Sequence, residues 1–91
     1  MNLITSDNIP AITPTFRFQW EKAQDCYVVL YPEGMVKLSH SAGEIMKRCD
    51  GATSVAGIIA DLHKEFPDAD LDVEVYKFLE VAREQGWIRT K

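Results

Sequence analysis

The sequence lacks the long hydrophobic run that a membrane-spanning helix requires. No apolar stretch in its 91 residues approaches the roughly 20 residues that cross a bilayer. The first residues also lack a basic segment followed by an apolar one, so they do not resemble a secretion signal. These absences indicate no membrane partner and favour a cytoplasmic location.

The sequence also lacks an excess of positive charge. It carries ten basic and fourteen acidic side chains, for a net charge of −4. Nucleic-acid binding depends on neutralising phosphates with lysine and arginine, and no basic cluster is present. We therefore expect no nucleic acid as a partner. The third predicted helix, between Asp70 and Gly86, could otherwise read DNA, but it contains more acidic than basic side chains.

Residues suited to metal binding or nucleophilic catalysis are few. Cys26 and Cys49 do not form a CxxC pair and lie in apolar patterns, which predicts reduced core thiols. His40 and His63 have no ligand spacing around them. No glycine-rich phosphate loop is present. We expect no cofactor, no metal and no catalytic residue, and we predict that the protein is not an enzyme.

The length allows one domain with one modest core. Residues 1–14 contain Pro10 and Pro14 and no sustained periodicity, which predicts an extended N-terminal arm. Residues 15–91 are expected to form a single domain.

Three short strands are predicted at the start of that domain. Residues 16–20 alternate aromatic and polar side chains, which is typical of a half-buried strand. Residues 26–31 are apolar on both faces, which predicts a central strand covered on two sides. Pro32 and Gly34 suit a tight turn that leads into a third strand at residues 35–38. The three strands predict an antiparallel meander.

Three helices are predicted in the second half. The first begins in a capping box formed by Ser41 and Glu44 and stops at Gly51. The second is capped by Thr53 or Ser54 and is followed by Pro67, and the third is capped by Asp70 and ends at Gly86. Strands followed by helices predict an α+β fold, with a three-stranded meander before a three-helix bundle.

The third predicted strand is the most informative segment. A short strand that ends a meander usually leaves one edge unpaired. In a small domain without a catalytic set, an open edge beside helices is suited to binding an extended peptide.

Several segments together resemble the PqqD family of pyrroloquinoline quinone biosynthesis proteins. The most specific is Tyr31-Pro32-Glu33-Gly34-Met35-Val36-Lys37-Leu38. The others are residues 16–21, Ser41-Ala42 with Glu44-Ile45, Asp50-Gly51 and Gly86-Trp87-Ile88.

This resemblance implies a winged-helix-like fold of the RiPP recognition element type (RiPP denotes a ribosomally synthesised and modified peptide). It also implies a peptide chaperone that binds the precursor peptide PqqA and presents it to the radical SAM enzyme PqqE. In such domains the leader peptide lies as an added strand against the third strand, in a groove closed by the third helix.

The expected peptide-binding residues follow from that arrangement. On the third strand they are Met35, Val36, Lys37 and Leu38. On the third helix they are Asp72, Val75, Tyr76, Leu79 and Arg83, from the buried stripe and one of its flanks. The sequence does not specify which flank faces the strand.

Self-association is the main alternative, because an unpaired edge can also pair with its own copy. The sequence is compatible with a monomer or a homodimer. A winged-helix DNA-binding domain is the less favoured alternative, because the chain has a net negative charge and no basic cluster.

Overall fold

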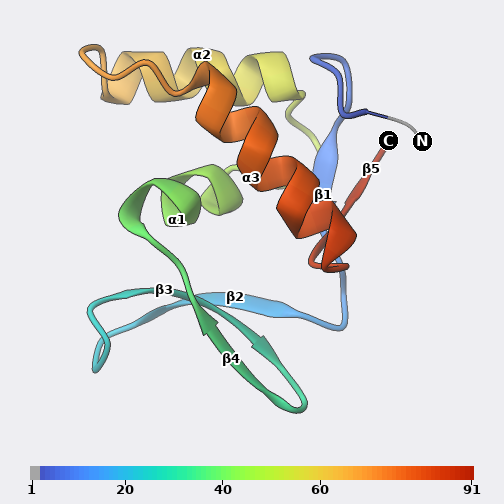
Figure 1. Ribbon diagram of the computed structural model, residues 1–91, viewed down its shortest axis with the longest axis vertical. Coiled ribbons are helices and arrows are strands. Elements are labelled where there is room, and N and C mark those ends of the chain that lie inside the picture. The colour runs from blue at the N-terminus through green and yellow to red at the C-terminus, as the bar shows by residue number, and fades with distance from the viewer. Residues whose placement is uncertain (1–2) are drawn as a thin grey trace.

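The computed structural model describes residues 3–91 and has three helices above a three-stranded antiparallel sheet (Figure 1). The sheet consists of β2 (Arg17–Glu21), β3 (Cys26–Tyr31) and β4 (Gly34–Lys37), in the order β2-β3-β4. The predicted α+β meander is therefore confirmed. The hairpin between β3 and β4 has Pro32 and Glu33 as its two loop residues, since Tyr31 pairs with Gly34.

A second, two-stranded ribbon joins the two ends of the chain. It pairs β1 (Pro10–Ile12) with β5 (Ile88–Thr90) in antiparallel fashion. Sequence reasoning did not predict either strand, because three residues are too few to show an alternating pattern. The ribbon also holds part of the expected N-terminal arm against the C-terminus. The boundary between arm and domain at residue 14 stays a prediction.

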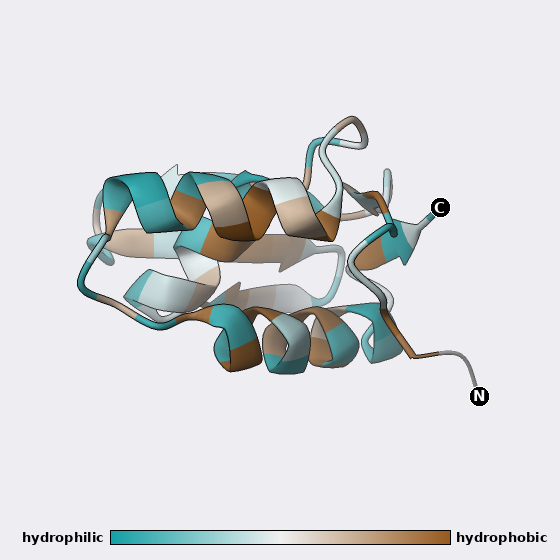
Figure 2. Cartoon of the chain, turned by 90° about the horizontal axis from the view of Figure 1, so that it is seen from above, coloured by the Kyte–Doolittle hydropathy of each residue, from teal (hydrophilic) through white to brown (hydrophobic). Residues whose placement is uncertain are grey.

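The helices are α1 (His40–Lys47), α2 (Val55–Glu65) and α3 (Asp72–Glu84). Seen from above, α2 and α3 run along opposite sides of the molecule with α1 between them (Figure 2). Within the described residues 3–91, no helix has the length and apolar character that crossing a membrane requires.

Two predicted helix starts were wrong by one or two residues. Helix α1 is capped by Ser39, whose Oγ accepts a hydrogen bond from the backbone N–H of Ala42; Ser41 instead donates its hydroxyl to Glu74 on α3. Helix α3 begins after Leu71, which makes no side-chain cap bond. Several polar residues near each start could serve as caps, and tertiary packing selects among them.

The predicted stop of α3 at Gly86 is confirmed. Gly86 has a positive φ of 82°, which a residue without a Cβ adopts at little cost. Its N–H bonds to the carbonyl of Arg83, and the N–H of Trp87 bonds to the carbonyl of Ala82. These two bonds make a Schellman stop. By contrast, α1 ends at Lys47, before Gly51, although Gly51 also has a positive φ.

The hydrophobic core lies between the sheet and the three helices. Its fully buried members come from β3, α1, α2 and α3; they include Val29, Ile45, Met46, Val55, Ile58, Leu62, Val75 and Leu79. The helices cover one face of the sheet (Figure 1), so the prediction that β3 is covered on two sides was wrong. Val28 faces the other side of the sheet and is still fully buried, with Gln19 of β2 and Lys37 of β4 as its register partners.

Candidate peptide-binding edge and groove

The free edge of β4 presents the main-chain groups of Met35 and Lys37. The N–H of Leu38 bonds to the carbonyl of Tyr27 at 2.9 Å, so these two residues form a hydrogen-bonded pair. Such pairs alternate along an antiparallel ladder, and in this register Val36 is bonded to β3 while Met35 and Lys37 point away from it. Among residues 3–91, no strand pairs with that outer edge.

Side chains on β4 divide between the two faces of the sheet. Val36 and Leu38 pack against the core beneath the helices, and Leu38 is only 7% exposed. Met35 and Lys37 point to the uncovered face and are exposed. A strand added at this edge would therefore place alternate side chains against the helices and against the uncovered face.

A groove begins where β4 ends. It has a volume of about 260 Å³ and lies between the start of α1 and one flank of α3. Ser39 connects the end of β4 to the groove, since it follows Leu38 in the chain and lines the groove. In Figure 1, β4 rises directly into α1, and β4 and α3 both lie on the near side of the molecule. The residues lining the groove are Ser39, Ser41, Ala42, Ile45, Glu74, Lys77, Phe78 and Val81.

The groove combines an apolar floor with a charged rim. Ala42, Ile45 and Phe78 supply apolar surface, and Val81 is 49% exposed beside them. Glu74 accepts the hydrogen bond from Ser41 at 3.0 Å, which joins the first turn of α1 to α3. Such a surface can bury apolar peptide side chains while leaving the rim in contact with solvent.

The structure places the predicted residues of α3 away from this groove. Val75 and Leu79 are fully buried in the core. Asp72 lies next to α2, where His63 Nε2 is 3.0 Å from its Oδ1. Arg83 donates to Glu80 at 2.6 Å, and Tyr76 is half-buried against the core. The flank chosen from the sequence is therefore the one that does not line the groove.

Of the α3 residues that line the groove, Phe78 was expected in the buried stripe, and the opposite flank with Glu74, Lys77 and Val81 was not singled out for peptide binding. The sequence held one signal for this flank. Val81 is apolar and lies beyond the buried stripe of α3, so it widens the apolar face of the helix on the groove side. Val73 is also apolar and is 66% exposed, but it does not line the groove. Pattern alone could not separate these two valines.

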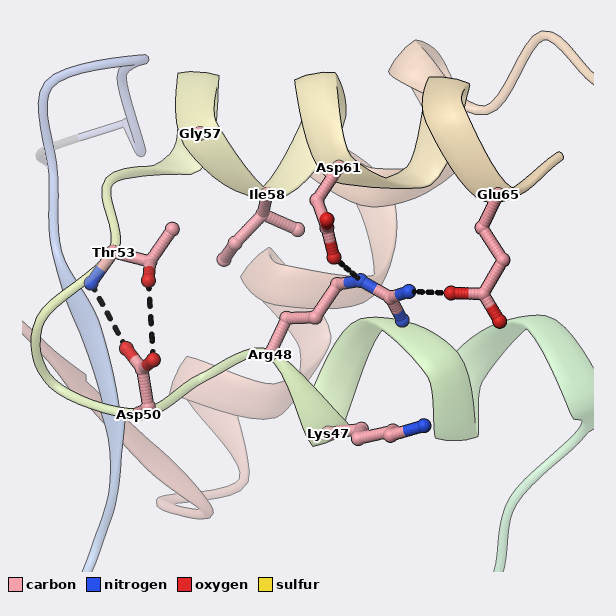
Figure 3. Close-up of a pocket in the computed structure, with 8 residues that line it drawn as sticks. All are labelled: Lys47, Arg48, Asp50, Thr53, Gly57, Ile58, Asp61 and Glu65. Carbon is pink, nitrogen blue, oxygen red and sulfur yellow. Dashed lines mark hydrogen bonds and ion pairs between the residues drawn. The ribbon is translucent and has the colours of Figure 1, made fainter. Parts of the chain in front are cut away.

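A larger hollow of about 540 Å³ lies between α1 and α2, and Figure 3 shows that charged side chains fill its wall. Arg48 donates to Glu44 at 2.9 Å, to Asp61 at 2.6 Å and to Glu65. Burial by itself would lower the pKa of Arg48, but the three carboxylates outweigh that effect and raise it.

These contacts link α1 to α2 across the hollow. The guanidinium of Arg48 is only 9% exposed and its donors are engaged by carboxylates on both helices. Asp50 accepts from the backbone N–H groups of Ala52 and Thr53, and these bonds lower the pKa of its carboxyl group. We therefore assign the hollow a structural role and retain the smaller groove as the candidate site.

The two cysteines differ in burial. Cys26 and Cys49 are both free thiols, and Cys49 is buried. Burial, followed by the nearby charge of Asp50, raises the pKa of the Cys49 thiol to about 12, which keeps it protonated at neutral pH. In residues 3–91, no three His, Cys, Asp or Glu side chains gather into a metal-binding group.

Comparison with known proteins identifies a family. The family model described as coenzyme PQQ synthesis protein D (PqqD) matches residues 26–88. A protein of Azotobacter vinelandii named PqqA binding protein is 52% identical over 89 residues, with 97% of each chain covered. One of the same name from Pseudomonas paraeruginosa is 53% identical with the same coverage.

A solved structure supports the fold. The chain is similar to the solution structure of the PqqD part of Methylobacterium extorquens PqqCD, described as a stand-alone RiPP recognition element. The TM-score is 0.78, and the match covers 94% of each chain at 20% identity. This likeness extends to the arrangement of the sheet and the three helices.

Proposed function

The chain belongs to the PqqD family, and we propose that it is a non-catalytic chaperone that binds the precursor peptide PqqA. Relatives at 52% and 53% identity carry the name PqqA binding protein. The observation that carries the proposal is the unpaired edge of β4, which leads directly into the groove between α1 and α3. Peptides commonly bind such edges by adding a strand.

Main-chain pairing fixes the position of the peptide but contributes little net affinity. Each hydrogen bond to Met35 or Lys37 is worth about 0.5–1.5 kcal/mol. Ordering each peptide residue costs about 1–2 kcal/mol of backbone entropy. Because these terms nearly cancel, the affinity comes from apolar peptide side chains that bury surface in the groove, at about 25 cal/mol per Å².

We further propose that the bound peptide is presented to the radical SAM enzyme PqqE, in the cytoplasm where ribosomal peptides are made. A chaperone that holds its ligand along one edge leaves the rest of the peptide free for an enzyme to modify. Within the site, the proposed contacts on α3 are Glu74, Lys77, Phe78 and Val81, because these residues line the groove. Val75 and Leu79 support that surface from the core.

Self-association through β4 is a competing use of the same edge. A second copy pairing there would occupy the main-chain groups of Met35 and Lys37. Sedimentation with and without synthetic PqqA separates the two cases: if copies pair through this edge, the peptide disperses the dimer.

A Met35→Pro variant tests strand addition directly. The N–H of Met35 points to the free edge, so proline removes a donor that the peptide would use and leaves the β3–β4 ladder intact. We expect roughly a tenfold loss of affinity for synthetic PqqA, measured by calorimetry, because one hydrogen bond is lost and a peptide carbonyl is left unpaired. Proline at Val36 is unsuitable for this test, because the N–H of Val36 belongs to the ladder with Val29.

Met35→Ala is the matched control, since it removes the same side chain but keeps the N–H. It should lose less affinity than the proline variant. Equal affinities for the two variants, with both proteins folded, would contradict strand addition at β4.

A further inference from the structure

Lys37 is the one charged side chain on β4, and it stands at the free edge. It points to the uncovered face of the sheet and is exposed. Its neighbour on β3 is Val28, and Val28 in turn pairs with Gln19 on β2. This row across the sheet therefore holds no acidic side chain to compensate the lysine.

The next row along the same face adds no negative charge. It consists of Met35, Leu30 and Arg17. Among the strand residues that point to this face, Glu21 is the acidic one; it lies on β2, with β3 between it and β4. Within residues 3–91, no carboxylate forms an ion pair with Lys37.

A peptide strand added at β4 would meet this lysine in a fixed way. Residues that lie side by side on paired strands point to the same face, whichever direction the added strand runs. The peptide residue beside Lys37 thus points to the uncovered face. The residues before and after it point to the helix side, towards Val36, Leu38 and the start of the groove.

We propose that Lys37 is a specificity-determining residue that selects an acidic side chain in the bound peptide. The peptide segment recognised is apolar–acidic–apolar, with the apolar residues directed to the helix side and the carboxylate beside Lys37. Opposite charges directly across paired strands attract, and like charges repel. This inference rests on the proposed function, because it requires a peptide paired with β4.

A charge scan of the peptide tests the proposal. Each Asp and Glu of synthetic PqqA is replaced singly by its amide, and each peptide is titrated against the wild-type protein and against Lys37→Met. The Lys37→Met variant keeps a long apolar stem beside Val28 and removes the charge. We expect one acidic position whose replacement weakens binding to the wild-type protein by about twofold to fivefold but leaves binding to Lys37→Met unchanged.

Charge reversal gives the sharper result. Lys37→Glu should weaken binding of unmodified PqqA by about fivefold to twentyfold, and a lysine at the coupled peptide position should restore it. If PqqA binds but no acidic position is coupled to Lys37, the selectivity proposal is overturned and peptide binding stands. If PqqA does not bind the wild-type protein, the proposed function fails and the selectivity proposal fails with it.

Discussion

Replacing Val81 by aspartate is expected to weaken binding of PqqA by roughly tenfold to a hundredfold. Val81 lines the groove beside Phe78 and is 49% exposed, so the new carboxylate stays hydrated in the free protein. A peptide side chain entering the groove would cover that carboxylate without pairing it, at a cost of about 1–3 kcal/mol. Calorimetric titration of the variant with synthetic PqqA measures the loss.

Val73→Asp is the matched control on the same helix. Val73 is 66% exposed and does not line the groove, so the same substitution there should leave the affinity within about twofold. Thermal melts of both variants establish that each is folded. An equal loss of affinity in the two variants would show that the groove flank of α3 has no special part in binding.

Replacing Gly43 by alanine is expected to destabilise the fold, although alanine normally favours a helix. A Cβ at Gly43 would lie 2.7 Å from Cδ2 and 3.1 Å from Cβ of Tyr27, so α1 would be pushed away from β3. Overpacking of this kind costs about 1–3 kcal/mol, against a gain of about 1 kcal/mol in helix propensity. We expect the free energy of unfolding, measured with urea, to fall by up to about 2 kcal/mol.

The same substitution in a Tyr27→Ala background supplies the control. Without the ring, the added methyl group has room, and Gly43→Ala should then raise the free energy of unfolding by up to about 1 kcal/mol. A loss of equal size in both backgrounds would mean that contact with Tyr27 does not explain why position 43 is glycine. Since Ser39 and Ala42 line the groove, a displaced α1 should also weaken peptide binding.

Local sequence pattern predicted the elements that have a clear hydrophobic period or that are bounded by proline or glycine. The β3 strand was predicted with its observed bounds, and the turn at Pro32 and Gly34 located the start of β4. The stop of α3 at Gly86 also followed from residue type, because a left-handed position after a helix favours glycine. These features depend on interactions within a few residues of the chain.

Features that depend on distant contacts were not predictable in this way. The β1–β5 ribbon pairs Pro10 with Thr90, and neither strand has a period of its own. The flank of α3 that meets the groove is fixed by the packing of α1 against α3, including the bond from Ser41 to Glu74. A helical wheel identifies both flanks of the buried stripe equally well, so the sequence alone could not choose between them.

Amide hydrogen exchange at Met35 and Lys37, followed by NMR with and without saturating synthetic PqqA, is the most direct measurement. In the free protein these two N–H groups point to solvent, whereas Leu38 is already bonded to Tyr27. A peptide that adds a strand to β4 should slow exchange at Met35 and Lys37 at least about tenfold, because their amides become hydrogen-bonded. Saturation with peptide while both amides exchange at their free rates would contradict binding at this edge.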